Sequence, residues 1–129
     1  MSLPQELKYT KTHEWARRAG NRVTVGITDY AQKEISDVVF VELPKSNAPV
    51  TAGKPAAVVE SVKAAFDIYA PVSGQVTAVN AELEKDPGLI NQDAYGRGFL
   101  FEIEMSQPSD WDALLSAEGY EQALKQGAH

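Results

Sequence analysis

The chain has 129 residues, 43% of them hydrophobic, which is enough for one compact core and too few for two substantial domains. Its 18 acidic residues outnumber its 12 basic ones, and no segment gathers enough lysine or arginine to follow a phosphate backbone, so we expect no nucleic acid as a partner. No apolar run approaches the roughly 20 residues needed to cross a bilayer, and the absence of cysteine excludes disulfides, thiolate nucleophiles and cysteine metal sites.

The first ten residues, MSLPQELKYT, contain neither the basic start and apolar block of a secretory signal nor the arginine-rich pattern of a transit peptide. We therefore expect a cytoplasmic protein that has no membrane partner. We further expect a monomer with a single domain over residues 1–129, in which residues 1–6 and 126–129 form flexible ends.

Short β-prone runs dominate the first hundred residues. Because Gly, Asn, Pro or Asp separates them, they predict strands at residues 7–10, 14–18, 22–27 and 38–43. Between the last two runs, apolar residues recur every four positions, at Ile27, Ala31 and Ile35. This spacing predicts one internal helix over residues 28–36, with Thr28 or Asp29 as its cap, which covers one end of a sheet.

Two β-prone arms in residues 56–70 (AAVVESVKAAFDIYA) flank Lys63 with no Gly, Pro or Asn at the reversal. A type I turn accepts most side chains, so we expect a hairpin with Lys63 at or beside its tip and facing water. A turn over residues 70–74 and a strand over residues 75–80 follow, and a short helical turn opens at Asn80. Taken alone, a lysine at such a tip is usually only a solvated charge.

The end of the chain has helical spacing. Ser109, followed three residues later by Asp112, resembles a helix cap. The helix that it starts would carry three apolar side chains on one face: Trp111, Leu114 and Leu115. After Ser116, a further helix with Tyr120 and Leu124 on one side is expected to pack on the sheet. The sequence thus predicts a mainly β fold with short helices.

The hairpin sequence Glu60-Ser61-Val62-Lys63-Ala64, with Gly74 eleven residues after the lysine, resembles the attachment hairpin of lipoyl domains. Biotin carriers typically have Met-Lys-Met at the tip, which this chain lacks. Other segments are similar to the H-proteins of the glycine cleavage system. They are Leu7-Lys8-Tyr9-Thr10, His13-Glu14-Trp15, Val25-Gly26-Ile27-Thr28-Asp29, Val38-Val39-Phe40-Val41-Glu42-Leu43-Pro44, Ala70-Pro71-Val72-Ser73-Gly74 and Gly88-Leu89-Ile90-Asn91. A lipoyl domain from a 2-oxo acid dehydrogenase would not explain the N-terminal segments or the C-terminal helices.

This resemblance implies a lipoyl-domain-like (hammerhead) β-sandwich or flattened barrel with Lys63 at a hairpin tip. It also implies that (R)-lipoate is bound to Lys63 as an amide, which removes the lysine charge. The attaching enzyme would be a lipoate ligase or an octanoyl/lipoyl transferase, with Glu60 and Gly74 as recognition residues. An unmodified lysine is protonated at neutral pH, so the chain is not expected to lipoylate itself.

The resemblance further implies a shuttle that is not itself an enzyme. Its clients would be glycine decarboxylase (P-protein), which loads the aminomethyl group of glycine, aminomethyltransferase (T-protein), which removes it, and dihydrolipoyl dehydrogenase (L-protein), which reoxidises the dithiol. The chemical steps would be catalysed by these client enzymes.

A loaded aminomethyl group decomposes in open water, so we expect the arm to fold into a cleft between the hairpin and the N-terminal strands. Glu14 and Asp67 are the candidate counter-charges for the cationic amine, and Thr12 is a candidate hydroxyl partner. Glu14 and Asp67 could equally be ordinary solvated strand residues. Phe66 stands where H-proteins often have a small polar residue, and its bulk is expected to narrow the cleft.

Other functions remain open at this point. Some H-like proteins relay octanoyl or lipoyl groups to other complexes, and an unmodified interaction domain would keep the fold without the cofactor. An enzyme would have to combine His13 with Glu14, but neighbours in a strand point to opposite faces, which favours a structural role for His13. No metal-ligand cluster is apparent in the sequence.

Overall fold

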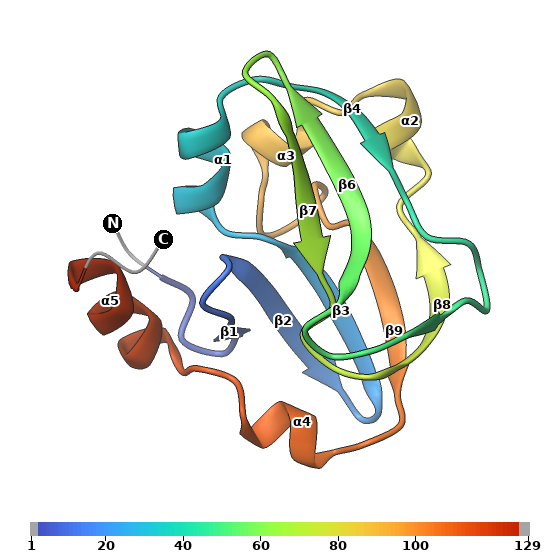
Figure 1. Cartoon of the computed structure of the whole chain (residues 1–129), viewed down its shortest axis with the longest axis vertical. Coiled ribbons are helices and arrows are strands. Elements are labelled where there is room, and N and C mark those ends of the chain that lie inside the picture. Colours follow the sequence, from blue (N-terminus) through green and yellow to red (C-terminus); the bar gives the residue numbers. More distant parts are fainter. Residues whose placement is uncertain (1–2, 127–129) are drawn as a thin grey trace.

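Antiparallel strands in two sheets form the framework of the computed structural model, which describes residues 3–126 (Figure 1). The larger sheet has the order β1-β2-β3-β9-β8-β5. Its strands in that order are β1 (Lys8–Tyr9), β2 (Glu14–Ala19), β3 (Arg22–Ile27), β9 (Phe101–Met105), β8 (Gly74–Val79) and β5 (Pro49–Val50). The smaller sheet has the order β4-β6-β7 and consists of β4 (Val38–Glu42), β6 (Pro55–Ser61) and β7 (Ala65–Tyr69).

The two sheets share one hydrophobic core. Its fully buried members include Val25 of β3, Val59 of β6 and Ile103 of β9. Burial alternates along most of β6 because successive side chains in a strand point to opposite faces. The alternation directs Val59 inward and its neighbour Glu60 outward. The expected mainly β sandwich with a lysine-bearing hairpin is therefore confirmed.

Short helices lie around the sheets. Within residues 3–126 they are α1 (Asp29–Ile35), α2 (Glu82–Lys85), α3 (Leu89–Gln92), α4 (Ser109–Asp112) and α5 (Ala117–Lys125). Thr28 caps α1 and Ser116 caps α5, because each hydroxyl accepts a hydrogen bond from a backbone N–H three residues later. The helices expected over residues 28–36, just after Asn80 and after Ser116 are confirmed. α3 has no counterpart among the predicted elements, because four residues are too few for a helical repeat to show.

The segment between β9 and α5 differs from the prediction. Ser109 is the first residue of α4 rather than its cap, and the cap position is taken by Pro108, which makes no side-chain cap hydrogen bond. α4 is only one turn long, so the prediction of a shared helical face is wrong for Trp111, Leu114 and Leu115. Leu115 instead forms two backbone hydrogen bonds of 2.8 Å with Tyr9, and this extended pairing prevents the helix from continuing.

A second apolar cluster joins the chain ends to the larger sheet. The ring of Tyr9 in β1 stacks on the ring of Tyr120 in α5, with 4.9 Å between the centroids, so α5 packs on the sheet as predicted. Leu3 is also buried in this cluster. The flexibility expected for residues 1–6 and 126–129 stays a prediction. Residues 1–2 and 127–129 lie outside the described part of the chain.

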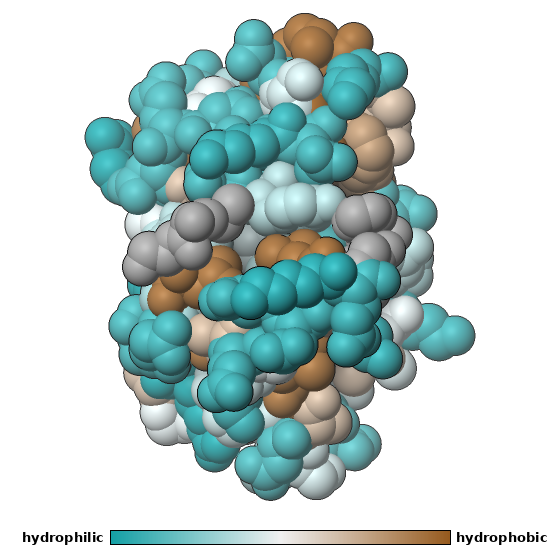
Figure 2. All heavy atoms as spheres, turned by 90° about the vertical axis from the view of Figure 1, so that its left-hand side faces the viewer, coloured by the Kyte–Doolittle hydropathy of each residue, from teal (hydrophilic) through white to brown (hydrophobic). Residues whose placement is uncertain are grey.

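Hydrophobic surface occurs in more than one place on the face of the molecule that lies on the left of Figure 1. Figure 2 shows that this face is largely hydrophilic, with hydrophobic surface at its upper end and further hydrophobic surface across its middle. No helix of residues 3–126 is both long and apolar enough to cross a membrane.

Candidate functional site

The tip of the β6–β7 hairpin is held by several hydrogen bonds. The Ser61 hydroxyl accepts a bond from the backbone N–H of Lys63 at 3.1 Å, and Ser61 N donates to the carbonyl of Ala64 at 2.9 Å. Val62 N donates to the carbonyl of Asp37 at 3.0 Å, which ties the tip to the segment before β4. Among the described non-glycine residues with positive φ, none lies at this tip. Lys63 is therefore presented at the tip, as predicted, by a firmly held backbone.

The side chain of Lys63 is exposed and reaches back to α1. Its Nζ donates a hydrogen bond of 2.9 Å to the carbonyl of Glu34, in the last turn of that helix. Carbonyls at a helix C-terminus carry partial negative charge and lack intrahelical partners, so they attract a cation. The amine thus lies between the hairpin and α1.

A cavity of about 270 Å³ opens beside this amine, between α1, β7 and the loop before β2. Its lining residues are Thr12, His13, Ile27, Tyr30, Ala31, Glu34, Ile35, Phe66, Asp67 and Ile68. Ile27, Ile35 and Ile68 make much of the wall apolar. Thr12 and Asp67 both belong to the lining, so the structure brings together two of the three predicted cleft residues, and Phe66 lies in the wall. Because Glu34 also lines the cavity, Lys63 Nζ ends at its rim.

The third predicted cleft residue, Glu14, lies behind the wall. Its side chain is fully buried and is absent from the lining residues. The carboxylate accepts hydrogen bonds from the hydroxyls of Thr10 and Thr12, the latter at 2.5 Å, and from the backbone N–H of Tyr69 at 3.1 Å. The interpretation of Glu14 as a solvated strand residue is therefore wrong, whereas Asp67 is exposed.

Burial raises the pKa of Glu14 above its usual value, and the hydrogen bonds from Thr10 and Thr12 oppose this rise. None of the ion pairs found among residues 3–126 involves Glu14. Thr12 lines the cavity and donates a hydrogen bond to Glu14. It therefore connects the cavity to a buried carboxylate that takes part in none of those ion pairs. Such a carboxylate is expected to attract a cation that enters the cavity.

His13 precedes β2 with a φ of 76° and is held from the C-terminal helix. Its Nδ1 lies 2.7 Å from the hydroxyl of Tyr120, which is also 2.9 Å from the hydroxyl of Thr28. Burial raises the pKa of Tyr120 to about 12, so the phenol stays protonated. α5 thereby supports the start of α1 and one wall of the cavity. Sequence reasoning missed this role of Tyr120, because helical spacing alone predicts only a packing contact.

The two predicted recognition residues lie in different places. Glu60 is half-buried on β6, directly opposite Ala65 and Phe40 on the neighbouring strands. Gly74 begins β8, and Figure 1 shows this strand starting at the end of the hairpin that is remote from the tip. A Cβ there would overlap the carbonyl oxygen of Glu104 in β9, so packing alone requires a glycine. The proposed recognition role of Gly74 stays a prediction.

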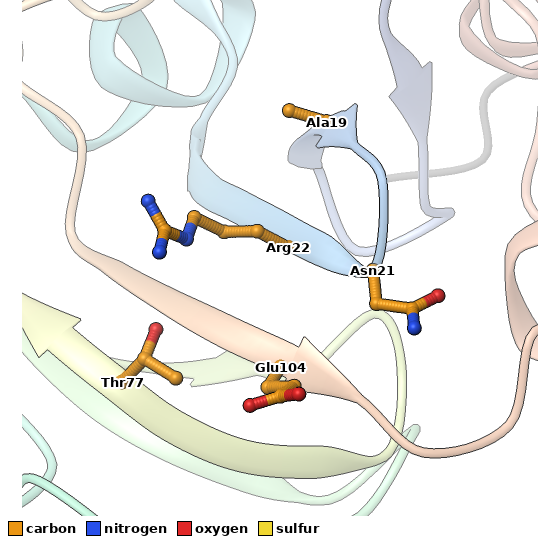
Figure 3. Close-up of a pocket in the computed structure, with 5 residues that line it drawn as sticks. All are labelled: Ala19, Asn21, Arg22, Thr77 and Glu104. Carbon is orange, nitrogen blue, oxygen red and sulfur yellow. The ribbon is translucent and has the colours of Figure 1, made fainter.

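A second cavity, of about 310 Å³, lies beside the β2–β3 turn (Figure 3). Its lining comprises Ala19, Asn21, Arg22, Thr77 and Glu104. Figure 3 shows these side chains spread around an open hollow, with Arg22 and Glu104 bringing opposite charges from β3 and β9. The β2–β3 turn lies at the end of the molecule opposite the tip of the β6–β7 hairpin (Figure 1). Among residues 3–126, no group of three or more acidic or histidine side chains could hold a metal ion.

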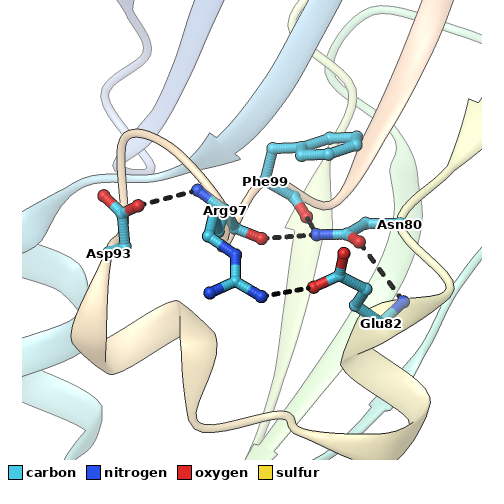
Figure 4. Close-up of polar contacts among 5 residues, drawn as sticks. All are labelled: Asn80, Glu82, Asp93, Arg97 and Phe99. Carbon is cyan, nitrogen blue, oxygen red and sulfur yellow. Dashed lines mark hydrogen bonds and ion pairs between the residues drawn. The ribbon is translucent and has the colours of Figure 1, made fainter.

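Polar contacts also fix the loop between α3 and β9 (Figure 4). Asn80 Nδ2 donates to the carbonyls of Arg97 and Phe99 at 2.6 and 2.8 Å. Asp93 accepts a bond from the backbone N–H of Arg97, whose guanidinium pairs with Glu82 at 3.0 Å. These contacts tie the loop to the segment that runs from the end of β8 into α2, so we assign them a structural role.

Comparisons with known proteins agree over nearly the whole chain. Residues 7–127 match the family model described as Glycine cleavage H-protein. A glycine cleavage system H protein of Thermus thermophilus is 53% identical over 99% of this chain and 100% of its own length. One from Shewanella oneidensis is 54% identical over 95% of this chain and 96% of its own. The crystal structure of a glycine cleavage system H protein from Mycobacterium marinum is 37% identical, with a TM-score of 0.86, over 97% of this chain and 99% of that one.

Proposed function

Because the chain belongs to the glycine cleavage H-protein family, we propose that Lys63 is the residue to which lipoate is attached, as an amide on Nζ. The chain is a lipoyl-carrying shuttle of the glycine cleavage system. The observation that carries the assignment to Lys63 is its exposed side chain at a hydrogen-bonded hairpin tip, beside a cavity with apolar walls.

The residues around Lys63 fit such a group. An exposed amine can be reached by a modifying enzyme, and the apolar wall formed by Ile27, Ile35 and Ile68 suits a hydrocarbon arm. When bound, lipoate supplies the disulfide and dithiol chemistry that a chain without cysteine cannot provide. The protein contributes the attachment point and a recess that excludes water, and we propose that it has no catalytic step of its own.

We place the carried amine in the cavity near Thr12 and Asp67. The amine is cationic, and the carboxylate of Asp67 lies in the lining while that of Glu14 lies directly behind Thr12. Two carboxylates on one side of a recess with apolar walls would hold a cation and keep water away from it. Burial raises the pKa of Glu14, and a cation nearby would lower it again and stabilise the charged form.

Glu14→Gln and Asp67→Asn keep the shape of these side chains and remove their charges. We expect each variant to release ammonia from the loaded protein faster than the unsubstituted protein, and the double variant at least about tenfold faster, because a charge-assisted hydrogen bond contributes about 1.5–3 kcal/mol, which corresponds to a factor of about ten or more. Ammonia release is measured over time in the absence of aminomethyltransferase. Glu118→Gln, on the exposed side of α5, serves as the control and should leave the rate unchanged. Equal lifetimes in the unsubstituted protein, both single variants and the double variant would show that Glu14 and Asp67 do not hold the amine.

Attachment itself is tested by intact mass before and after incubation with a lipoate ligase, lipoate and ATP. We expect a gain of one lipoyl amide, located by peptide mapping on the peptide that contains Lys63. A gain spread over several lysines, or no gain, would contradict the assignment. The attaching enzyme is a proposed partner, as are glycine decarboxylase, aminomethyltransferase and dihydrolipoyl dehydrogenase.

The alternative function is a relay of octanoyl or lipoyl groups to other complexes, and it would use the same lysine. Glycine-dependent bicarbonate exchange by purified glycine decarboxylase separates the two functions. Stimulation by the lipoylated protein supports the cleavage shuttle, and no stimulation favours the relay. The cytoplasmic location and the monomeric state stay predictions.

A further inference from the structure

Three large apolar side chains are exposed near the hairpin tip. Val39, Phe40 and Val62 have 55%, 52% and 66% of their surface accessible, and they are the large hydrophobic residues found exposed in the described part of the chain. Strand register brings them together, since Val38 pairs with Ser61 and Phe40 with Glu60. We call Val39, Phe40 and Val62 the tip patch. It belongs to the same end of the molecule as the hydrophobic surface at the top of Figure 2.

A register irregularity in β4 creates most of this patch. The pairing with β6 shifts between Val38 and Phe40, so Val39 is an extra residue of the kind found in a β-bulge. In a regular strand one of two successive side chains faces the core, yet Val39 and Phe40 are both exposed while Val38 and Val41 stay buried. Packing of the core therefore does not require apolar residues at these two positions, and an exposed apolar cluster of this kind is typical of a binding surface.

The strands that carry the tip patch contribute charges of one sign. The three strands of the smaller sheet contain Glu42, Glu60 and Asp67 and no lysine, arginine or histidine. Glu60 lies directly opposite Phe40, and Glu42 follows Phe40 by two residues on the same strand. Lys63 is the cation beside the patch, and acylation removes its charge. The complementary partner surface is apolar at its centre with lysine or arginine around it.

We propose that the tip patch is the docking surface for the enzyme that acylates Lys63. This inference rests on the proposed function. Acylation forms an amide between Lys63 Nζ and the acyl carbon of an activated donor, and the bond from that carbon to its leaving group breaks. The ammonium group loses one proton before it attacks and a second as the amide forms. The active site must therefore reach Nζ itself, and Val62 is the residue next to Lys63 in the chain. Clients that act on the far end of a long arm need no such contact.

Phe40→Ser and Val62→Ser test the proposal in steady-state acylation by a purified lipoate ligase with lipoate and ATP. Each is expected to raise the KM for this protein about tenfold with little change in kcat, because an aromatic or aliphatic anchor is lost while the reacting amine is untouched. Phe40→Leu keeps an apolar anchor and should stay within about twofold of the unsubstituted protein. Because the substituted side chains are exposed, thermal unfolding should be unchanged, and this is checked for each variant.

The dependence of the KM on sodium chloride distinguishes the contribution of the acidic residues around the patch from that of its apolar residues. The KM of the unsubstituted protein should rise with salt as complementary charges are screened. An unchanged KM in both serine variants would overturn the proposal. The proposal would also be overturned if the variants lost only their binding to glycine decarboxylase, or only self-association measured by sedimentation. If the unsubstituted protein is not acylated at all, the proposed function fails instead, so the two failures are distinct.

Discussion

Lys63→Arg is expected to gain no lipoyl mass and to support no glycine-dependent bicarbonate exchange. A guanidinium stays protonated in proteins and cannot act as the nucleophile that forms the amide. It can still donate a hydrogen bond to the carbonyl of Glu34, as Lys63 does, and the side chain is exposed. The free energy of unfolding should therefore change by less than about 0.5 kcal/mol. Intact mass, bicarbonate exchange and urea unfolding on one preparation measure the three quantities.

Lys45→Arg is the matched control for this experiment, since Lys45 is exposed and lies outside the helices and strands. It should be lipoylated and should support exchange at the level of the unsubstituted protein. A mass gain that persists in the Lys63 variant would place the attachment on another lysine. A Lys63→Arg protein that is folded and gains no mass would show that its failure to be lipoylated does not result from a loss of stability.

Gly74→Ala is expected to lower the free energy of unfolding by about 3 kcal/mol or more. The added Cβ would overlap the carbonyl oxygen of Glu104 and lie 2.7 Å from Cγ2 of Ile103. The Glu104 oxygen belongs to the backbone of β9, which pairs with β8, so it cannot rotate away as a flexible side chain could. Overpacking of this kind forces backbone shifts and is among the more costly substitutions. Urea unfolding followed by circular dichroism measures the change.

Gly119→Ala provides the opposite control within the same chain. Gly119 lies in α5, and a Cβ there would come no closer than 3.4 Å to its neighbours. Alanine in a helix is more favourable than glycine by about 0.5–1 kcal/mol, so this variant should be slightly more stable. If Gly74→Ala were as stable as the unsubstituted protein but poorly lipoylated, the glycine would serve recognition rather than packing.

Local patterns in the sequence were sufficient to predict most elements. The two β-prone arms on either side of Lys63 predicted the hairpin, and the repeat of Ile27, Ala31 and Ile35 predicted α1, which Thr28, one of the two expected cap residues, caps. Both depend on contacts between residues close in the chain. The one-turn helix α4 depends on a distant partner, because Leu115 pairs with Tyr9, and no local pattern records that pairing.

The site, like the fold, was predicted from the sequence only in part. Thr12 and Asp67 were predicted for the cleft from the family resemblance, and both line the cavity. The complete burial of Glu14 was not predicted, because an acidic residue at the start of a strand is ordinarily solvated. Its burial requires two nearby threonines and the backbone of β7 to supply hydrogen bonds. The support of His13 by Tyr120 joins residues more than 100 positions apart, beyond the reach of sequence spacing.

The proposed attachment to Lys63, whose amine donates a hydrogen bond to the end of α1, would change the charge of the carrier at this place between its empty and its loaded form. The formal net charge of the unmodified chain is −6, and loss of the lysine charge makes it −7, since −6 − 1 = −7. A cationic amine carried into the cavity restores −6 and returns a positive charge to a recess whose wall includes Glu34, the residue that Lys63 first contacted. An enzyme that senses this region of the surface would meet an empty carrier and a filled one as electrostatically distinct substrates, before any contact with the sulfur atoms.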